Sequence, residues 1–341
     1  MTPRPSPLLV AALLACCTLP AAARKIYKYT DADGQVHFTD IRPQGQADVS
    51  ESVVTDVENH HIAELRVDGG EDVREARVFN QIAGPVEVQL GLVEQSNVTA
   101  EPPLPLNVVL QGKEERVLTR LRRADGLRAA SFSLDFRAVP GDPAARAAGV
   151  DYRLPLGGGY RIDQGFGGSF SHTDEQSRYA IDLAVDEGTP VLAAREGTVM
   201  QVENDFYGSG LDREKFATRA NVVRVLHADG SMAVYAHLKP ESVTVQPGRH
   251  VYAGDQLGAS GNTGYSTGPH LHFCVQVNRG MRLVSVPFRL VVPAGAVVIP
   301  EGMGDAVIEA IDEYGAPPLV DWDESDVDQL LLVMMPRKLS W

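Results

Sequence analysis

The chain has 341 residues, which is enough for two or three domains. Hydrophobic residues make up 44% of it, as expected for a protein with a sizeable core. The formal net charge of −14 argues against a nucleic-acid binder and gives no sign of a basic membrane patch.

The first 23 residues have the pattern of a secretory signal peptide. A positively charged start with Arg4 precedes a short apolar run, 8–17, and the segment ends on three alanines. The run is too short to span a bilayer as a stable anchor. An alternative is a lipoprotein cleavage box ending at Cys16, which would tether the protein by a lipid, although the Leu at its middle position fits poorly. We expect export to the periplasm or cell envelope and no transmembrane span in the mature chain. The type of signal peptidase and the oligomeric state stay open.

Cleavage after Ala23 would leave Cys274 as the only thiol. A single thiol cannot form an internal disulfide. An exported chain without a disulfide must be held by its hydrophobic core or by a metal.

Residues 24–43 predict a small β-hairpin module. Alternating, aromatic-rich runs at 26–30 and 36–39 flank a turn, Asp31-Ala32-Asp33-Gly34. The module resembles DUF4124, a domain of unknown function found at the N-terminus of many exported bacterial proteins. That resemblance implies an envelope location and no chemistry. The polar, acidic segment 44–74 that follows is predicted to be a partly mobile linker.

Residues 75–140 are predicted to form a small β-sandwich. Short strand patterns separated by turn residues are typical of that architecture. The strand patterns cover 76–82, 86–93, 106–110, 116–121 and 130–136. We see no cluster of titratable residues here and interpret the segment as a packing or positioning module. At the other end of the chain, 291–341 is an acidic tail to which we assign no role.

Residues 152–290 differ in sequence pattern from the preceding segment, with tight turns and many glycines. Within them a glycine-rich loop, 261–269, leads into a strand in which apolar residues alternate with other types. His270 and His272 begin that strand two residues apart. Because side chains on a strand alternate between faces, both imidazoles point the same way, as in a metal or proton-transfer site.

Four motifs in this region carry a family resemblance. They are Gly-Thr-Pro-Val at 188–191, Tyr-Ala-His-Leu at 235–238, Gly-Asp-Gln-Leu-Gly at 254–258 and Ser-Thr-Gly-Pro-His-Leu-His-Phe at 266–273. Together they resemble the lysostaphin/LytM-type M23 zinc peptidases. The resemblance implies a mostly β protein whose C-terminal domain is an antiparallel, lysostaphin-like peptidase fold. It also implies one zinc ion and hydrolysis of peptide bonds in peptidoglycan cross-links or stems.

The resemblance places the zinc ligands at Asp182 and His272, with His172 as the third. A catalytic zinc needs about three protein ligands and an open position for water. The common family pattern has its first histidine four residues before the aspartate, where this chain has Arg178. His172 lies ten residues before Asp182, as in a variant branch with a longer loop. The entropic cost of closing a loop of that length is modest, because it grows slowly with length. A lone Asp182 in an apolar strand would also be costly without a cation nearby.

His237 and His270 are the candidates for proton transfer and for steadying the developing oxyanion. The corresponding histidines of Tyr-Ala-His-Leu and His-Leu-His hold these roles in the family. Which of the two is the base stays open, as do the bond that is cut and whether the N-terminal modules cover the groove.

We therefore expect a zinc metalloendopeptidase that acts on peptidoglycan peptides. The alternative is a catalytically inactive protein of the same fold that binds and activates another cell-wall hydrolase. The unusual position of His172 keeps that alternative open, because inactive members lose zinc ligands.

Overall fold

The computed structural model describes residues 24–30, 36–39, 49–54, 62–70, 72–147, 151–157, 160–216, 219–292 and 295–298. The predicted signal peptide with Cys16, and residues 299–341 of the predicted tail, lie outside the described residues. Within the described ranges, no helix has both the length and the apolar character needed to cross a membrane. The predicted class, a mostly β protein with antiparallel sheets, is confirmed.

The N-terminal module has three strands rather than the two of the predicted hairpin. Strands β1 (Arg24–Thr30) and β2 (Val36–Thr39) pair antiparallel, as the sequence predicted. A third strand, β3 (Val49–Val54), pairs with the other edge of β1. An isolated two-stranded hairpin is only marginally stable in water, and a third strand relieves that weakness.

The sandwich consists of two sheets, as predicted. One sheet has the order β4 (Ala63–Gly69), β5 (Val73–Asn80), β9 (Glu115–Arg123) and β7 (Val98–Glu101). The other has the order β10 (Ser131–Pro140), β6 (Val86–Ser96) and β8 (Leu106–Leu110). Ala76 and Val78 of the first sheet pack against Val86 and Val88 of the second, and all four are fully buried.

Strand β4 corrects the expectation that 44–74 is a linker. That segment contains β3, β4 and the first residues of β5. In β4, Ala63 is buried and Leu65 packs against the sandwich core. The acidic composition misled the prediction because β4 is an edge strand, and an edge strand keeps polar residues on its solvent side.

The C-terminal domain is built on an eight-stranded sheet. Its order is β12 (Arg161–Gln164), β13 (Ala180–Ala184), β22 (His270–Asn278), β18 (Met232–Ala236), β17 (Val222–Leu226), β15 (Gly197–Glu203) and β19 (His250–Val251), with β23 (Leu283–Val286) paired to β22. The predicted hairpin across residues 228–230 is confirmed as β17 and β18.

Smaller pairings complete this domain. They are β14 (Pro190–Leu192) with β20 (Gln256–Ala259), β16 (Ser209–Gly210) with β21 (Gly264–Tyr265), and β11 (Asp151–Arg153) with β24 (Arg289–Val292) and β25 (Gly295–Val298). The one-turn helix α1 (Arg213–Phe216) is the only helix among the described residues. Strand β25 and part of β24 fall in the segment predicted to be an acidic tail.

The central strand β22 has one apolar face and one polar face, as its alternating sequence predicted. Leu271, Phe273 and Val275 are buried in the core of the domain. Phe273 packs edge-on against Phe288 and lies beside the buried Tyr235. Burial of these rings fixes the register of β22, because a slip of one residue would turn every side chain to the other face. The polar face, with His270 and His272, is thereby held in place.

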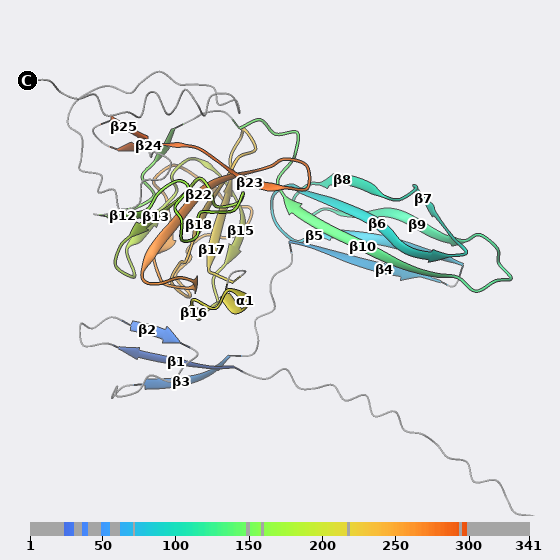
Figure 1. Ribbon diagram of the computed structural model, residues 1–341, viewed down its shortest axis with the longest axis horizontal. Helices are drawn as coiled ribbons and strands as arrows, with labels where there is room; N and C mark the ends of the chain where they lie inside the picture. Colours follow the sequence, from blue (N-terminus) through green and yellow to red (C-terminus); the bar gives the residue numbers. More distant parts are fainter. Residues whose placement is uncertain are drawn as a thin grey trace, which may run out of the picture.

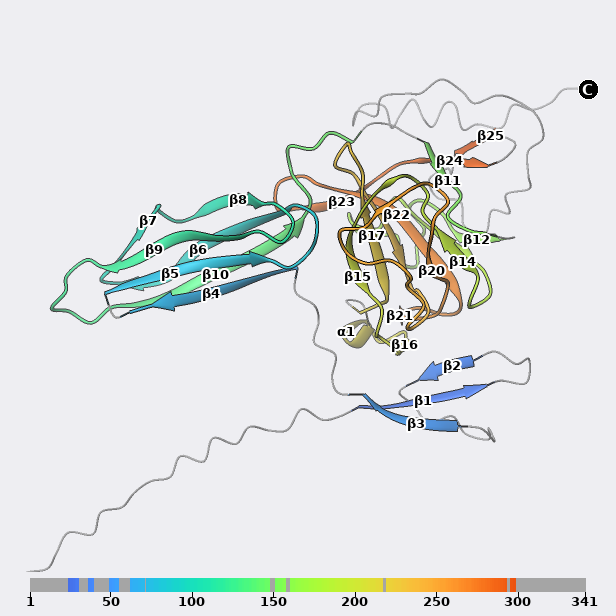
Figure 2. The same ribbon diagram turned by 180° about the vertical axis from the view of Figure 1, so that it is seen from behind.

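The sandwich projects from the C-terminal domain, as Figures 1 and 2 show, and joins it through a continuous core. Met200 and Met232 of the C-terminal domain belong to the same buried cluster as the sandwich residues. At the junction the buried carboxylate of Glu87 accepts hydrogen bonds from Asn278 Nδ2 at 2.9 Å and from the Met281 amide at 2.7 Å. The junction therefore buries both apolar and hydrogen-bonded polar groups.

Candidate metal centre

Strand pairing brings two of the predicted ligands face to face. Asp182 on β13 lies directly opposite His272 on β22. His272 Nδ1 is 2.8 Å from Asp182 Oδ1. On the other side of β22, His272 lies opposite Ala236 of β18, so His237 follows directly after a partner of His272. The sheet therefore gathers a carboxylate and three imidazoles at one end of three adjacent strands.

His172 reaches the same place from the segment that connects β12 to β13. Its backbone amide donates to the Gly168 carbonyl at 3.0 Å, and its Nδ1 lies 2.8 Å from the Gly165 carbonyl. The contact with Gly165 makes Nδ1 the protonated nitrogen and leaves Nε2 facing Asp182 Oδ1 at 3.2 Å. The side chain is almost wholly buried, which contradicts a solvated histidine in a polar loop.

The structure brings together the three side chains predicted as zinc ligands. One ligand atom from each of His172, Asp182 and His272 lies within 4.8 Å of the others. Two nitrogens and one carboxylate oxygen are donors that zinc accepts, and three protein ligands leave a position open. The donor set therefore fits a catalytic zinc.

Gln164 supports this site and was missed in the sequence. Its side-chain amide donates to Asp182 Oδ2 at 2.9 Å and to Ser171 Oγ at 2.7 Å. Its Oε1 accepts the backbone amides of Phe170 and Ser171. One glutamine thus orients the carboxylate and the turn that carries His172. Gly168 makes room for this side chain, because a Cβ there would lie 2.1 Å from Gln164.

The surroundings of Asp182 favour its ionised form, which is the form that binds a cation. Burial alone would raise the pKa of this carboxyl, but hydrogen bonds from His172 and His272 outweigh it and hold the pKa well below its usual range. Burial would conversely lower the pKa of His172, and the hydrogen bond and charge of Asp182 raise it instead. A bound metal would take the place of these protons, since ligands must be deprotonated to bind it.

His237 is held in a fixed tautomer at the edge of the site. It follows β18 with a φ of 62°, a left-handed conformation that is uncommon outside glycine and that accompanies functional sites. Its Nδ1 lies 2.6 Å from the Thr263 carbonyl and so carries the proton. Burial, and next to it the charges of His270 and His272, lower the pKa of His237 to about 3. Its Nε2 is therefore a free acceptor at neutral pH.

His270 is oriented in the same way. Its Nδ1 lies 2.8 Å from the Gly268 carbonyl and 3.3 Å from Ser266 Oγ. Its Nε2 faces Asp182 Oδ1 at 3.8 Å. The ring centroids of His237 and His270 are 4.6 Å apart. Two imidazoles, each with one nitrogen tied to a carbonyl, therefore border the three candidate ligands.

Aromatic residues flank the site. Phe170, two residues before His172, stacks on Tyr265 of β21 with ring centroids 5.8 Å apart, and it is half exposed. The guanidinium of Arg213 lies 5.2 Å from the centroid of the Tyr265 ring. Strand β21 pairs with β16, so residues 209–210 lie beside the glycine-rich loop that precedes His270.

Two other residues, Cys274 and His227, have structural roles. Cys274 lies on the His272 face of β22 but is buried, and burial raises the pKa of its thiol to about 12. It packs with Ala180 and Val234. His227 follows directly after β17. Its side chain is buried, with Nδ1 2.7 Å from the Glu196 carbonyl.

Comparison with known proteins confirms the family resemblance. Residues 176–283 match peptidase family M23, and residues 12–59 match a domain of unknown function, DUF4124. The M23 match contains Asp182, His237 and both histidines of β22 but begins after His172. The assignment of His172 therefore rests on the geometry described above.

Three curated relatives indicate the range of similarity. An uncharacterized metalloprotease of Haemophilus influenzae is 37% identical over 29% of this chain and 18% of its own. Lysostaphin of Staphylococcus simulans is 33% identical over 40% of this chain and 25% of its own. The peptidoglycan DD-endopeptidase ShyA of Vibrio cholerae is 27% identical over 67% of this chain and 45% of its own. The chain spans less than half the length of each of these relatives.

Proposed function

We propose that this chain, which carries an M23 peptidase domain, is a zinc-dependent endopeptidase that hydrolyses peptide bonds in peptidoglycan cross-links or stems. The observation that carries the proposal is the convergence of His172, Asp182 and His272 within 4.8 Å. The substrate class is supported by relatives whose names describe peptidoglycan peptidases, among them the DD-endopeptidase ShyA.

The three converging side chains would hold the zinc ion. His172 and Asp182 each have a second contact that fixes their orientation, to the Gly165 carbonyl and to Gln164 respectively. Such outer contacts orient ligands and tune the affinity for metal. Zinc bound there would polarise the scissile carbonyl and lower the pKa of an attacking water.

His237 and His270 would handle the proton. Each has its Nδ1 proton engaged by a backbone carbonyl, at 2.6 Å from Thr263 and at 2.8 Å from Gly268. The Nε2 of each is left to accept a proton from the attacking water or to donate a hydrogen bond to the developing oxyanion. Their neighbouring rings make either division of these two roles workable.

We further propose that the protein works in the periplasm or cell envelope. The N-terminal pattern of a signal peptide and the DUF4124 match at 12–59 support export. Peptidoglycan lies in the same compartment, so location and proposed substrate agree.

The test is digestion of purified peptidoglycan, with and without a chelator, followed by mass spectrometry of the released fragments. We expect cleavage that a chelator abolishes and added zinc restores, at a single type of peptide bond. His272→Ala serves as the matched inactive protein. Release of no fragments by the zinc-loaded protein would favour the alternative, an inactive M23-fold protein that activates another hydrolase.

A further inference from the structure

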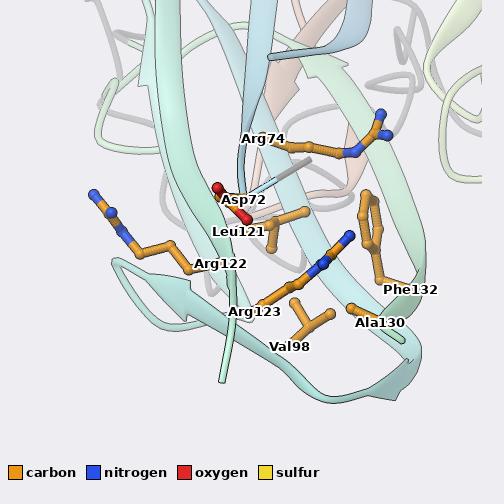
Figure 3. A pocket seen from close by; sticks show the side chains of 8 residues that line it. All are labelled: Asp72, Arg74, Val98, Leu121, Arg122, Arg123, Ala130 and Phe132. Carbon is orange, nitrogen blue, oxygen red and sulfur yellow. The ribbon is translucent and has the colours of Figure 1, made fainter. Parts of the chain in front are cut away.

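The far end of the sandwich has a pocket between its two sheets. Figure 3 shows this pocket, whose volume is about 230 Å³. Its apolar wall includes Val98, Leu121 and Phe132, and its charged groups include Arg74, Arg123 and Asp72. With Arg122, three arginines stand against one aspartate, so the lining carries a formal charge of +2. A chain with a net charge of −14 thus concentrates positive charge at one place.

Two of these arginines lie on the interior face of the sandwich. Arg74 is two residues before the fully buried Ala76 on β5 and therefore points to the same side. It pairs across the sheet with Leu121, and Arg123 follows Leu121 by two residues on β9. In Figure 3, Arg74 and Arg123 extend on the side of Phe132, whereas Arg122 extends to the opposite side of the strand.

The inward arginines have no carboxylate partner among the described residues. Elsewhere in the same sheet, Arg77 and Arg120 both reach Glu75, at 2.9 Å and 3.0 Å. No such ion pair is formed by Arg74 or Arg123 with any described residue. Arg74 is exposed and Arg123 is only partly buried, so both guanidinium groups are open to an anion from solvent. Guanidinium groups bind phosphate and carboxylate through paired hydrogen bonds.

The loop that joins two lining residues, Arg123 and Ala130, presents a large apolar side chain to solvent. The loop between β9 and β10 carries Leu127, which is 99% exposed. Asn97 fixes this loop, because its side chain donates to the carbonyls of Asp125 at 2.8 Å and Arg128 at 3.0 Å. The Leu127 amide donates to Asp125 Oδ1 at 2.9 Å. An ordered loop that presents a leucine next to arginines is a pattern of membrane-surface binding.

We propose that the far end of the sandwich binds the surface of an anionic phospholipid membrane. The lipid phosphate enters the pocket between Arg74 and Arg123, and Leu127 inserts among the acyl chains. The ten-residue strand β10 spans roughly 33 Å at the usual rise per residue, so the junction with the metal-binding domain would stand off from the lipid. Membrane binding at this end would not depend on the peptidase activity.

The test is co-sedimentation of the full chain with vesicles of phosphatidylcholine alone or with three parts in ten phosphatidylglycerol. We expect binding to the anionic vesicles only. Each arginine near an anionic surface contributes about 1 kcal/mol, so R74Q/R123Q should weaken binding about 30-fold. Leu127→Ser should weaken it about tenfold through the lost apolar burial. Cleavage of soluble wall peptides and thermal unfolding should stay unchanged in both variants.

The matched control is R137Q/R146Q, which removes two charges from exposed arginines away from the pocket. We expect it to bind within about twofold of wild type, because those arginines lie outside the pocket. Three results would overturn the proposal: equal loss of binding in the control, equal binding of wild type to neutral vesicles, or no binding at all. Displacement from vesicles by millimolar glycerol phosphate, with no effect of Leu127→Ser, would show a site for soluble phosphate and would also overturn it.

Discussion

The candidate metal-binding corner, formed by His172, Asp182 and His272, and the far end of the sandwich both contain charged groups, but they satisfy those charges differently. Asp182 accepts hydrogen bonds from His172 and His272 and from Gln164, so its charge is met within the domain. At the far end of the sandwich, Arg74 and Arg123 line one pocket with Asp72, and neither arginine forms an ion pair with a described residue. We therefore propose a cation as the ligand of the first site and an anion as the ligand of the second.

The two regions therefore differ in what fixes the orientation of their side chains before a ligand binds. In the corner, orientation of the side chains is fixed before any metal binds, because backbone carbonyls and Gln164 hold them. In the pocket, the positions are set by strand register alone. Substitutions in the corner should therefore change chemistry by orders of magnitude, whereas substitutions elsewhere should change stability or binding by smaller amounts.

The largest effect is expected from Asp182→Asn. The amide keeps the shape of the side chain but removes the negative charge, so zinc content should fall from one ion per chain to near zero. Cleavage of peptidoglycan should fall by about 10³-fold or more, since metal activation of water is lost. Metal analysis and a digestion assay measure both. The control is Asp163→Asn, on the neighbouring strand, where Asp163 pairs with Arg161; this variant should retain zinc and activity. If Asp182→Asn kept its zinc, the proposed site would be wrong.

His237→Ala should separate proton handling from metal binding. Zinc should remain at one ion per chain, because His237 is not among the three converging ligands. The rate should fall by about 10²–10⁴-fold, the usual contribution of a positioned acid or base. The exposed His250 offers the control, and His250→Ala should be unaffected. Loss of zinc from His237→Ala would make this residue a ligand and undo the division of roles.

The buried His227 predicts a dependence of stability on pH. Burial lowers its pKa to about 4 in the folded chain, whereas the unfolded value is about 6.5. The unfolded state therefore binds more protons between these values, so stability is fully present above about pH 6.5 and is lost as the pH falls towards 4. The neighbouring Arg195 and Asp229 shift the same pKa in opposite directions and to a smaller extent.

This loss should amount to about 3 kcal/mol. Urea unfolding of the metal-free chain across that range measures it. His227→Gln should show a correspondingly flatter pH profile in the same chelating buffer. Profiles that run parallel in the two proteins would show that His227 does not carry the effect.

Glu87→Ala tests whether the sandwich and the C-terminal domain unfold as one unit. The substitution leaves Asn278 Nδ2 and the Met281 amide without their acceptor in a buried junction. It should destabilise the protein by about 2–3 kcal/mol, as for a lost hydrogen bond to a charged group. Asp135→Ala, on an exposed face of β10, should stay within about 0.5 kcal/mol. Two separate unfolding transitions in wild type would instead indicate that the junction contributes little.

The sequence predicted much of the fold and the three side chains that converge at the candidate metal-binding corner. Motifs with fixed spacing, such as His270-Leu271-His272, carry their own strand geometry, and alternation then determines which side chains share a face. The sequence could not reveal Gln164, because a glutamine at a strand end has no distinctive pattern until its partner Asp182 is located. It also misjudged β4, whose polar outer face resembles a linker.

The role of His172 as a zinc ligand is the part of the proposal that most needs a direct test. It lies outside the M23 match, and only the turn held by Gly165 and Gly168 brings its Nε2 to Asp182. The decisive measurement is the zinc content and activity of His172→Ala beside wild type at the same free zinc concentration. We predict one zinc per chain in wild type and less than about one-tenth of that in the variant, with activity lost in parallel. Full zinc and full activity in His172→Ala would contradict the three-ligand site.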